Sequence, residues 1–222
     1  MTTRIANIIS ILSIVALAAY IALMYSGLPD PMPTHWNASG QADDYMSKPA
    51  GSASLAAVPL IIFIIFKLIP VVSPRGFRTE SFTEVLNILM TVSVVFGSVI
   101  GVGAIQAALG SDFNISTFVM VAVGLLLMVL GNFLGKVRKY FFIGIRTPWT
   151  LASDEVWAKT HRLGGWCFVI AGIAMAIMAV AVPDVTWTIY IVVTMALIPV
   201  VYSYFAYRRI EGFAPDPPVE ED

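Results

Sequence analysis

Charged residues are scarce in this sequence of 222 residues. Only 12% of the residues are charged, whereas 58% are hydrophobic, and the mean hydropathy is +0.84. A water-soluble domain carries about twice that share of charged residues. The composition therefore excludes an ordinary soluble domain and indicates an integral membrane protein.

Residues that commonly carry chemistry are scarce as well. The single cysteine, Cys167, cannot form an intramolecular disulfide. The two histidines, His35 and His161, fall on opposite sides of the membrane in the topology inferred below, so they cannot share a metal ion. The sequence has no ligand spacing typical of zinc, no nucleophile elbow and no basic tract. We therefore expect no enzyme activity, no metal, no cofactor and no nucleic-acid partner.

Long apolar runs make up most of the chain. A membrane-spanning helix needs about 20 apolar residues to cross about 30 Å of hydrocarbon. Six runs qualify, and they cover residues 5–25, 53–72, 84–108, 115–135, 164–182 and 186–207. The first run continues through Met24, so we expect a spanning helix there and not a signal peptide. The predicted fold class is an all-α, polytopic membrane protein with six transmembrane helices.

The positive charges are distributed unevenly between the two sides of this topology. If the six spans alternate in direction, every lysine and arginine except Lys48 falls on one side. Lysine and arginine are retained in cytoplasmic loops. The N and C termini are therefore predicted to be cytoplasmic, and the long loop between the first two spans is predicted to face outward.

Small residues recur within the predicted spans. The pairs Gly97/Gly101 and Gly131/Gly135 have the four-residue spacing that lets helices approach closely in lipid. They predict helix packing within the chain or in a homo-oligomer, and the sequence leaves both open. Asn132, a polar residue within the fourth span, is expected to hydrogen-bond to a neighbouring helix.

One long polar segment, residues 144–162, separates the fourth and fifth apolar runs. Its first part, GIRTPWT, is predicted not to be helical, because Pro148 disfavours the helical conformation of Thr147. Ser153 then has the properties of a helix N-cap, and Trp157 and His161 lie one helical turn apart. We therefore predict an interfacial amphipathic helix between helices 4 and 5.

That amphipathic helix has two further expected features. Glu155 and Lys159 are four residues apart, so they are predicted to form an ion pair. The paired glycines Gly164 and Gly165 are expected to mark a bend where the amphipathic helix turns into the fifth span.

The predicted outer loop contains the stretch LPDPMPTHWNASGQADDYMSKP. It resembles a small domain found near the N-terminus of many bacterial and archaeal membrane proteins. The residues that carry this resemblance are Pro31, Pro33, His35, Trp36, Asn37, Gly40, Asp44, Tyr45, Lys48 and Pro49.

The polar segment, together with a Gly-Asn pair upstream, resembles the signature of the SdpI immunity-protein family. The matching residues are Gly131, Asn132, Gly144, Ile145, Arg146, Thr147, Pro148, Trp149, Thr150, Leu151, Trp157, Thr160, His161 and Arg162. The family commonly has an asparagine shortly before Gly144, where this chain has Phe141 and Phe142.

The resemblance implies six spans and a function in the plasma membrane. Members of the family protect a cell from a secreted, membrane-active peptide toxin and can signal its presence. We hypothesise that the outer loop contacts the toxin through His35, Trp36, Asn37, Asp44 and Tyr45. The inner segment is expected to respond to the toxin or to recruit a cytoplasmic regulator. Its candidate residues are Asn132, Gly144, Arg146, Thr147, Pro148, Trp149, Trp157, His161 and Arg162.

Three parts are expected along the chain: a two-helix module at 1–72, a four-helix module at 73–207 and a disordered acidic tail at 208–222. Two other functions stay open, a small-molecule or lipid transporter and a regulatory membrane subunit. The absence of an ionisable residue near the middle of a span disfavours a transporter. The bilayer itself is the one partner that the composition requires.

Overall fold

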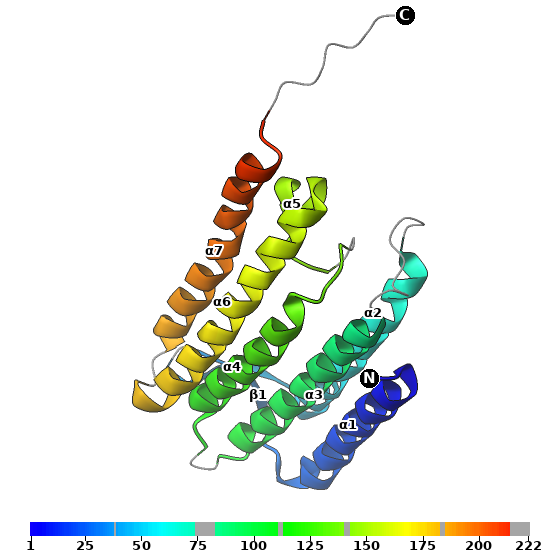
Figure 1. Cartoon of the computed structure of the whole chain (residues 1–222). Coiled ribbons are helices and arrows are strands. Elements are labelled where there is room, and N and C mark those ends of the chain that lie inside the picture. The colour runs from blue at the N-terminus through cyan, green and yellow to red at the C-terminus, as the bar shows by residue number, and fades with distance from the viewer. Residues whose placement is uncertain (38, 74–82, 111–112, 140–142, 183–184, 214–222) are drawn as a thin grey trace, which may run out of the picture.

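The computed structural model describes residues 1–37, 39–73, 83–110, 113–139, 143–182 and 185–213. Six long helices lie side by side (Figure 1), and each is long and apolar enough to cross a membrane. They are α1 (Thr3–Met24), α2 (Lys48–Val72), α3 (Thr83–Ala108), α4 (Ile115–Leu134), α6 (Asp154–Ala181) and α7 (Val185–Ile210). The predicted class of all-α polytopic membrane protein is confirmed.

The shorter elements lie in the connections. A 3-10 helix η1 (Tyr25–Gly27) follows α1, and two strands, β1 (Met32–Trp36) and β2 (Ala42–Met46), form an antiparallel hairpin before α2. A five-residue helix α5 (Pro148–Ala152) precedes α6. Helix α7 continues to Ile210, so the first residues of the predicted tail are helical, and residues 214–222 lie outside the described part.

The six long helices form two groups. Helices α1 and α2 both pack against α3, whereas α6 packs against both α4 and α7. The two groups meet mainly where α3 contacts α4, and this contact is less extensive than those of α3 with α1 and α2 or of α6 with α4 and α7. The connection between α3 and α4 is short, which keeps these two helices adjacent (Figure 1).

Glycine determines how closely α4 and α6 approach. A methyl group added at Gly131 would lie 2.6 Å from the carbonyl oxygen of Gly165, and one added at Gly124 would lie 2.7 Å from that of Gly172. The predicted Gly131 packing position is confirmed, and its partner is a glycine of the same chain. In α3, Gly97 faces Pro59 and Ile62 of α2, while Gly101 faces Leu17 of α1.

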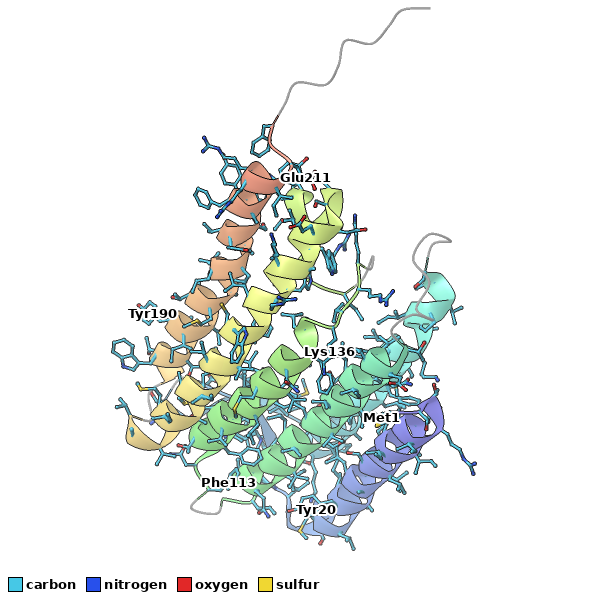
Figure 2. All side chains as sticks on the ribbon, in the orientation of Figure 1. Met1, Tyr20, Phe113, Lys136, Tyr190 and Glu211 are labelled. Carbon is cyan, nitrogen blue, oxygen red and sulfur yellow. The ribbon has the colours of Figure 1, made fainter. Side chains whose placement is uncertain are left out.

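The two ends of the bundle differ in what they carry. The hairpin lies at the end where α1 and α3 finish, whereas α5, the N-terminus and the end of α7 lie at the other end (Figure 1). Figure 2 shows Tyr20 and Phe113 toward the first end and Met1, Lys136 and Glu211 toward the second. We call these the hairpin end and the termini end. The cytoplasmic location of the termini stays a prediction.

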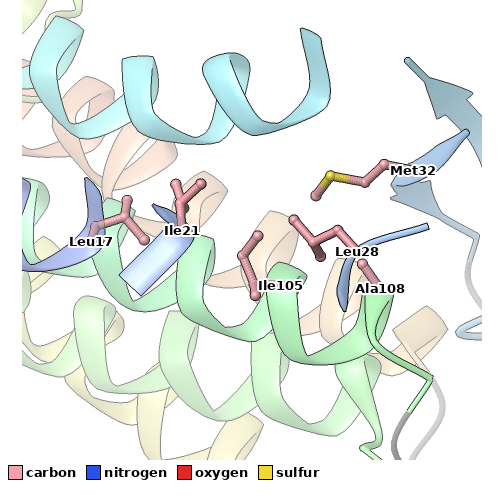
Figure 3. Packing of buried hydrophobic residues seen from close by; sticks show 6 residues of the cluster. All are labelled: Leu17, Ile21, Leu28, Met32, Ile105 and Ala108. Atoms are coloured by element: carbon pink, nitrogen blue, oxygen red, sulfur yellow. The ribbon is translucent and has the colours of Figure 1, made fainter. Parts of the chain in front are cut away.

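A hydrophobic cluster fixes the hairpin to the helices at the hairpin end (Figure 3). Met32 at the start of β1 is fully buried, and it packs with Leu28 against residues from the last turns of α1 and α3. The buried members of the cluster are Leu17, Ile21, Leu28, Met32, Ile105 and Ala108. The hairpin is therefore an integral part of the bundle.

A second cluster joins the two helix groups at the termini end. Leu89 of α3 packs with Val137, which follows α4, and with Trp157 of α6, and all three are buried. At the hairpin end, Gly40 in the hairpin turn lies against Ser116 in the first turn of α4. The two groups are thus connected at both ends of the seam between α3 and α4.

Candidate functional site

The predicted site residues fall into two clusters at opposite ends of the bundle. His35, Trp36, Asn37, Asp44 and Tyr45 belong to the hairpin. The remaining candidates surround α5 and the start of α6, except Asn132, which lies near the end of α4. The structure therefore brings each set of predicted residues together and keeps the two sets apart.

Asn37 shapes the turn of the hairpin. Its side-chain oxygen accepts hydrogen bonds from the backbone N–H of Ser39 at 2.9 Å and of Gln41 at 3.0 Å. Gly40 has a φ of +74° and donates its N–H to the carbonyl of Asn37. An asparagine that bonds to the backbone two residues ahead is a common turn device. Asn37 and Gly40, which belong to the motif of the outer loop, therefore have a structural role in the turn.

The carboxylate next to His35 belongs to Asp43, which was not among the predicted site residues. The Nδ1 atom of His35 lies 2.6 Å from Oδ1 of Asp43, and both side chains are exposed. Asp44 instead accepts a hydrogen bond from the N–H of Tyr45. The strand register pairs His35 with Asp44, but the pairing is irregular on both sides of His35. The hairpin was not predicted, so the sequence did not show which of the two carboxylates reaches the ring.

A pocket of about 280 Å³ lies beneath the hairpin. Its roof is formed by β1 and the turn, and its floor by apolar side chains from α2, α3 and α4. The lining residues are Thr34, His35, Trp36, Asn37, Leu55, Ile100, Ala104, Ile115, Ser116 and Val119. The hydroxyl of Thr34 is buried and has no hydrogen-bond partner among the described residues. The pocket therefore offers a mainly apolar surface.

At the other end of the bundle, His161 holds the chain that leads into α5. The N–H of Ile145 donates to Nε2 of His161 at 2.8 Å, so that nitrogen carries no proton. The Nδ1 atom must then be the protonated one, and it donates to the carbonyl of Trp157 at 2.8 Å. His161 is fully buried and is a neutral, structural acceptor in this arrangement.

Trp157 and His161 form a stack that requires a glycine above it. Their ring centroids are 4.0 Å apart, which confirms that they share a helix face, and Trp157 Nε1 donates to the carbonyl of Val137 at 2.9 Å. Gly144 has a φ of +126°, and a methyl group there would lie 2.5 Å from His161 Nε2 and 2.6 Å from the ring of Trp157. Only glycine fits this position.

Threonines organise α5 and attach it to α7. The Thr147 hydroxyl accepts from the N–H of Thr150, and the Thr150 hydroxyl accepts from the N–H of Thr147, which is a capping box. The Thr147 hydroxyl also lies 2.9 Å from the buried hydroxyl of Ser203 on α7. Trp149 packs edge-on against Tyr204 of the same helix. Thr150 and Ser203 were not predicted as site residues. The three-residue spacing of Thr147 and Thr150 is that of a capping box and could have indicated Thr150.

The segment between α4 and α6 differs from its prediction in two respects. Gly144–Thr147 is not helical, as expected, but Pro148, Trp149 and Thr150 are helical. Proline is well tolerated in the first turn of a helix, where its missing N–H is not needed. In addition, Asp154–Ala181 is one continuous helix, so the residues predicted as a separate amphipathic helix form the first turns of α6.

The expected bend at Gly164–Gly165 is wrong, because both glycines serve close packing. A methyl group at Gly164 would lie 2.5 Å from the Ile145 side chain, and Gly165 contacts the backbone of Gly131. The local predictions for α6 are confirmed. Ser153 caps the helix, and Lys159 pairs with Glu155 at 2.7 Å.

Arg146, Arg162 and Asn132 have exposed polar side chains, whereas Thr147, Trp157 and His161 are buried. The expected hydrogen bond from Asn132 to a neighbouring helix is not present among the described residues. Its side chain points out of the bundle because Gly131, the residue next to it, occupies the face that contacts α6. Asn132 instead lines a surface pocket together with Arg162.

Within the described ranges, no three histidine, cysteine, aspartate or glutamate residues gather where they could hold a metal ion. The His35–Asp43 pair has no third potential ligand within that part of the chain. The pocket at the hairpin end can contact an apolar ligand. At the termini end, the buried contacts form a rigid frame, and guanidinium groups are exposed beside it.

Two segments of the chain match known protein families, and each segment contains one of the two clusters of predicted site residues. Residues 136–203 match the SdpI/YfhL protein family, and residues 12–64 match a domain of unknown function, DUF1648. The first match contains the frame around His161, and the second contains the hairpin. No solved structure is significantly similar to the chain.

A curated relative matches almost the whole chain. The immunity protein SdpI of Bacillus subtilis (strain 168) is 26% identical over 208 residues, which cover 93% of this chain and 98% of that protein. The similarity therefore extends over all six spanning helices, the hairpin and the signature segment, in the same order. The chain is thus similar to the SdpI/YfhL protein family in its signature segment and to the immunity protein SdpI over nearly its whole length.

Proposed function

We propose that this protein is an immunity protein of the plasma membrane, which protects its cell from a secreted peptide toxin that attacks the membrane. The termini are cytoplasmic in this proposal, and the hairpin faces outward. The observation that carries it is the apolar pocket beneath the hairpin, at the end of the bundle that a secreted peptide reaches first. The similarity to the immunity protein SdpI of Bacillus subtilis supports the same function.

The chemistry of the pocket suits a membrane-active peptide. Such a peptide is amphipathic, so it has apolar side chains to bury and backbone groups that need hydrogen-bond partners. Leu55, Ile100 and Val119 provide the apolar floor for one such side chain. The exposed His35–Asp43 pair is placed to bond to the peptide backbone or its polar side chains.

At the termini end, the proposal divides the signature residues into two roles. Gly144, Thr147, Trp157 and His161 hold α5 against α6 and α7 through buried contacts. Arg146 is exposed beside this frame and is the proposed contact for a cytoplasmic regulator that would report the presence of toxin.

The test is survival of a toxin-sensitive bacterium that expresses this chain and is challenged with the secreted peptide. Trp36→Ala removes an aromatic side chain that lines the pocket, so we expect protection to be lost while the protein reaches the membrane at its normal level. Gln41→Ala is the matched control, because Gln41 is exposed on the same hairpin and does not line the pocket.

Two outcomes would contradict the proposal. Full protection by Trp36→Ala would exclude the pocket as the toxin site. Absence of protection by the inserted wild-type protein would exclude immunity against that peptide and favour a transport or regulatory function.

A further inference from the structure

A second pocket lies near the termini end, on the surface groove between α4 and α6. Its volume is about 200 Å³, and it is lined by Asn132 and Gly135 of α4 and by Arg162, Trp166 and Val169 of α6. The close contact of Gly131 with Gly165 forms its floor, because neither residue has a side chain to fill the hollow. The pocket is therefore a gap in the surface that faces the membrane.

The polar groups in this pocket have no partner among the described residues. Neither the Arg162 guanidinium nor the Asn132 amide forms a hydrogen bond or ion pair with another described residue. Unsatisfied hydrogen-bond donors are costly where they border the hydrocarbon of the bilayer, because water is absent there. A ligand that accepts hydrogen bonds and carries negative charge would satisfy both side chains.

The position of Arg162 along α6 corresponds to the level of lipid headgroups. With 28 residues, α6 is longer than the roughly 20 residues that cross the hydrocarbon. Its first turns carry Asp154, Glu155 and Lys159, so the excess length lies at the termini end. Arg162 follows these charged residues at the start of the apolar part. Trp166 is one turn further and is 65% exposed, as is typical of interfacial tryptophan.

Beyond this pocket, the same groove continues as an apolar surface toward the hairpin end. A second hollow between α4 and α6 is lined by Met128, Ile173, Ala176 and Ile177, among others, and has almost no polar surface. Along α6, Arg162, Trp166, Val169 and Ile173 follow helical spacing, so they lie on one face. The groove thus combines a cationic, hydrogen-bonding end with an apolar extension.

We propose that this groove is a binding site for an anionic phospholipid. The phosphate accepts hydrogen bonds from Arg162 and Asn132, the glycerol region lies against Trp166, and an acyl chain follows Val169 and Ile173. A free phosphate ion would use the polar end alone. The apolar extension is the reason to favour a lipid, and this inference does not depend on the proposed immunity function.

The experiment is native mass spectrometry of the full-length protein after delipidation and titration with phosphatidylglycerol or phosphatidylcholine. We expect tighter binding of phosphatidylglycerol and a decrease of about fivefold in its affinity for Arg162→Gln, as for the loss of one arginine near an anionic lipid surface. Asn132→Leu should also weaken binding. Arg138→Gln is the matched control, because Arg138 is an exposed cation at the same end and does not line the pocket.

The outcomes separate the possibilities. Loss of the preference for phosphatidylglycerol in Arg162→Gln, with Arg138→Gln unchanged, would support the lipid site. Equal affinity of wild-type protein and Arg162→Gln for phosphatidylglycerol would overturn it. Displacement of the lipid by millimolar inorganic phosphate would also overturn it, because the site would then recognise a free anion. Unchanged elution of the variants in detergent gel filtration shows that they are folded.

Discussion

At the scale of single residues, the signature segment is held by buried hydrogen bonds, each of which needs one specific partner. The N–H of Ile145, the indole of Trp157 and both nitrogens of His161 are each satisfied within the protein. A buried donor or acceptor that loses its partner costs about 1–3 kcal/mol. Substitutions in this frame should therefore reduce stability before they affect any binding surface.

Gly144→Ala tests this frame directly. The added methyl group would collide with the Trp157–His161 stack at a φ of +126°, so we expect a loss of about 3 kcal/mol or more in the free energy of unfolding. Gly212→Ala is the control, because Gly212 also has a positive φ, +77°, but a methyl group there would meet nothing within 4 Å. It should cost only about 1 kcal/mol. Equilibrium unfolding in mixed detergent micelles measures both, and equal losses would show that the stack imposes no constraint.

Some of these residue contacts were predictable and others were not. The Trp157–His161 stack and the Glu155–Lys159 pair follow from helical spacing alone. The Thr147–Ser203 contact joins residues 56 positions apart, and the contact of His35 with Asp43 belongs to an irregular part of the strand pairing. Such contacts depend on tertiary structure, which a local pattern does not contain.

At the scale of elements, α4 and α6 are the pair whose backbones approach most closely among the glycine contacts. Gly131→Ala places a methyl group 2.6 Å from a backbone oxygen that cannot move aside, so we expect a loss of about 1–3 kcal/mol in stability. Gly135→Ala lies one turn away, where the nearest atom is the Arg162 Cα at 3.6 Å. This control should be neutral or slightly stabilising. Thermal unfolding of the two variants in detergent compares them, and similar melting temperatures would contradict close packing at Gly131.

The spans were predicted from hydropathy, but their ends and the hairpin were not. A hydrophobic run shows where a helix crosses the membrane, whereas α2 begins at Lys48 and α6 at Asp154, in polar sequence. The hairpin strands have five residues each and contain Pro33, Asp43 and Asp44, which are uncommon in strands. The burial of Met32 among helix residues, and not strand propensity, stabilises the hairpin.

At the scale of the whole molecule, the six spans place the hairpin and the two termini at opposite ends. Which end is cytoplasmic depends on the distribution of lysine and arginine, and it can be tested with introduced cysteines. Cys167 is buried and is the only native cysteine, so Cys167→Ala provides a suitable background.

In that background, Ser39→Cys in the hairpin turn should react with a membrane-impermeant maleimide in intact cells. Glu211→Cys, beyond the end of α7, should react only after the cells are permeabilised. The reverse pattern would place the termini outside and would remove the proposed access of a secreted peptide to the pocket.

The seam between α3 and α4 has a mechanical consequence. The two helix groups are connected at its hairpin end by the contact of Gly40 with Ser116, and at its termini end by Leu89, Val137 and Trp157. Between these points, α3 and α4 leave an open apolar groove of about 270 Å³. Because apolar packing is sparse between these two connections, we expect a relative movement of the two helix groups to change the width of this groove. A peptide bound under the hairpin would therefore act on the same seam that Leu89, Val137 and Trp157 close at the termini end.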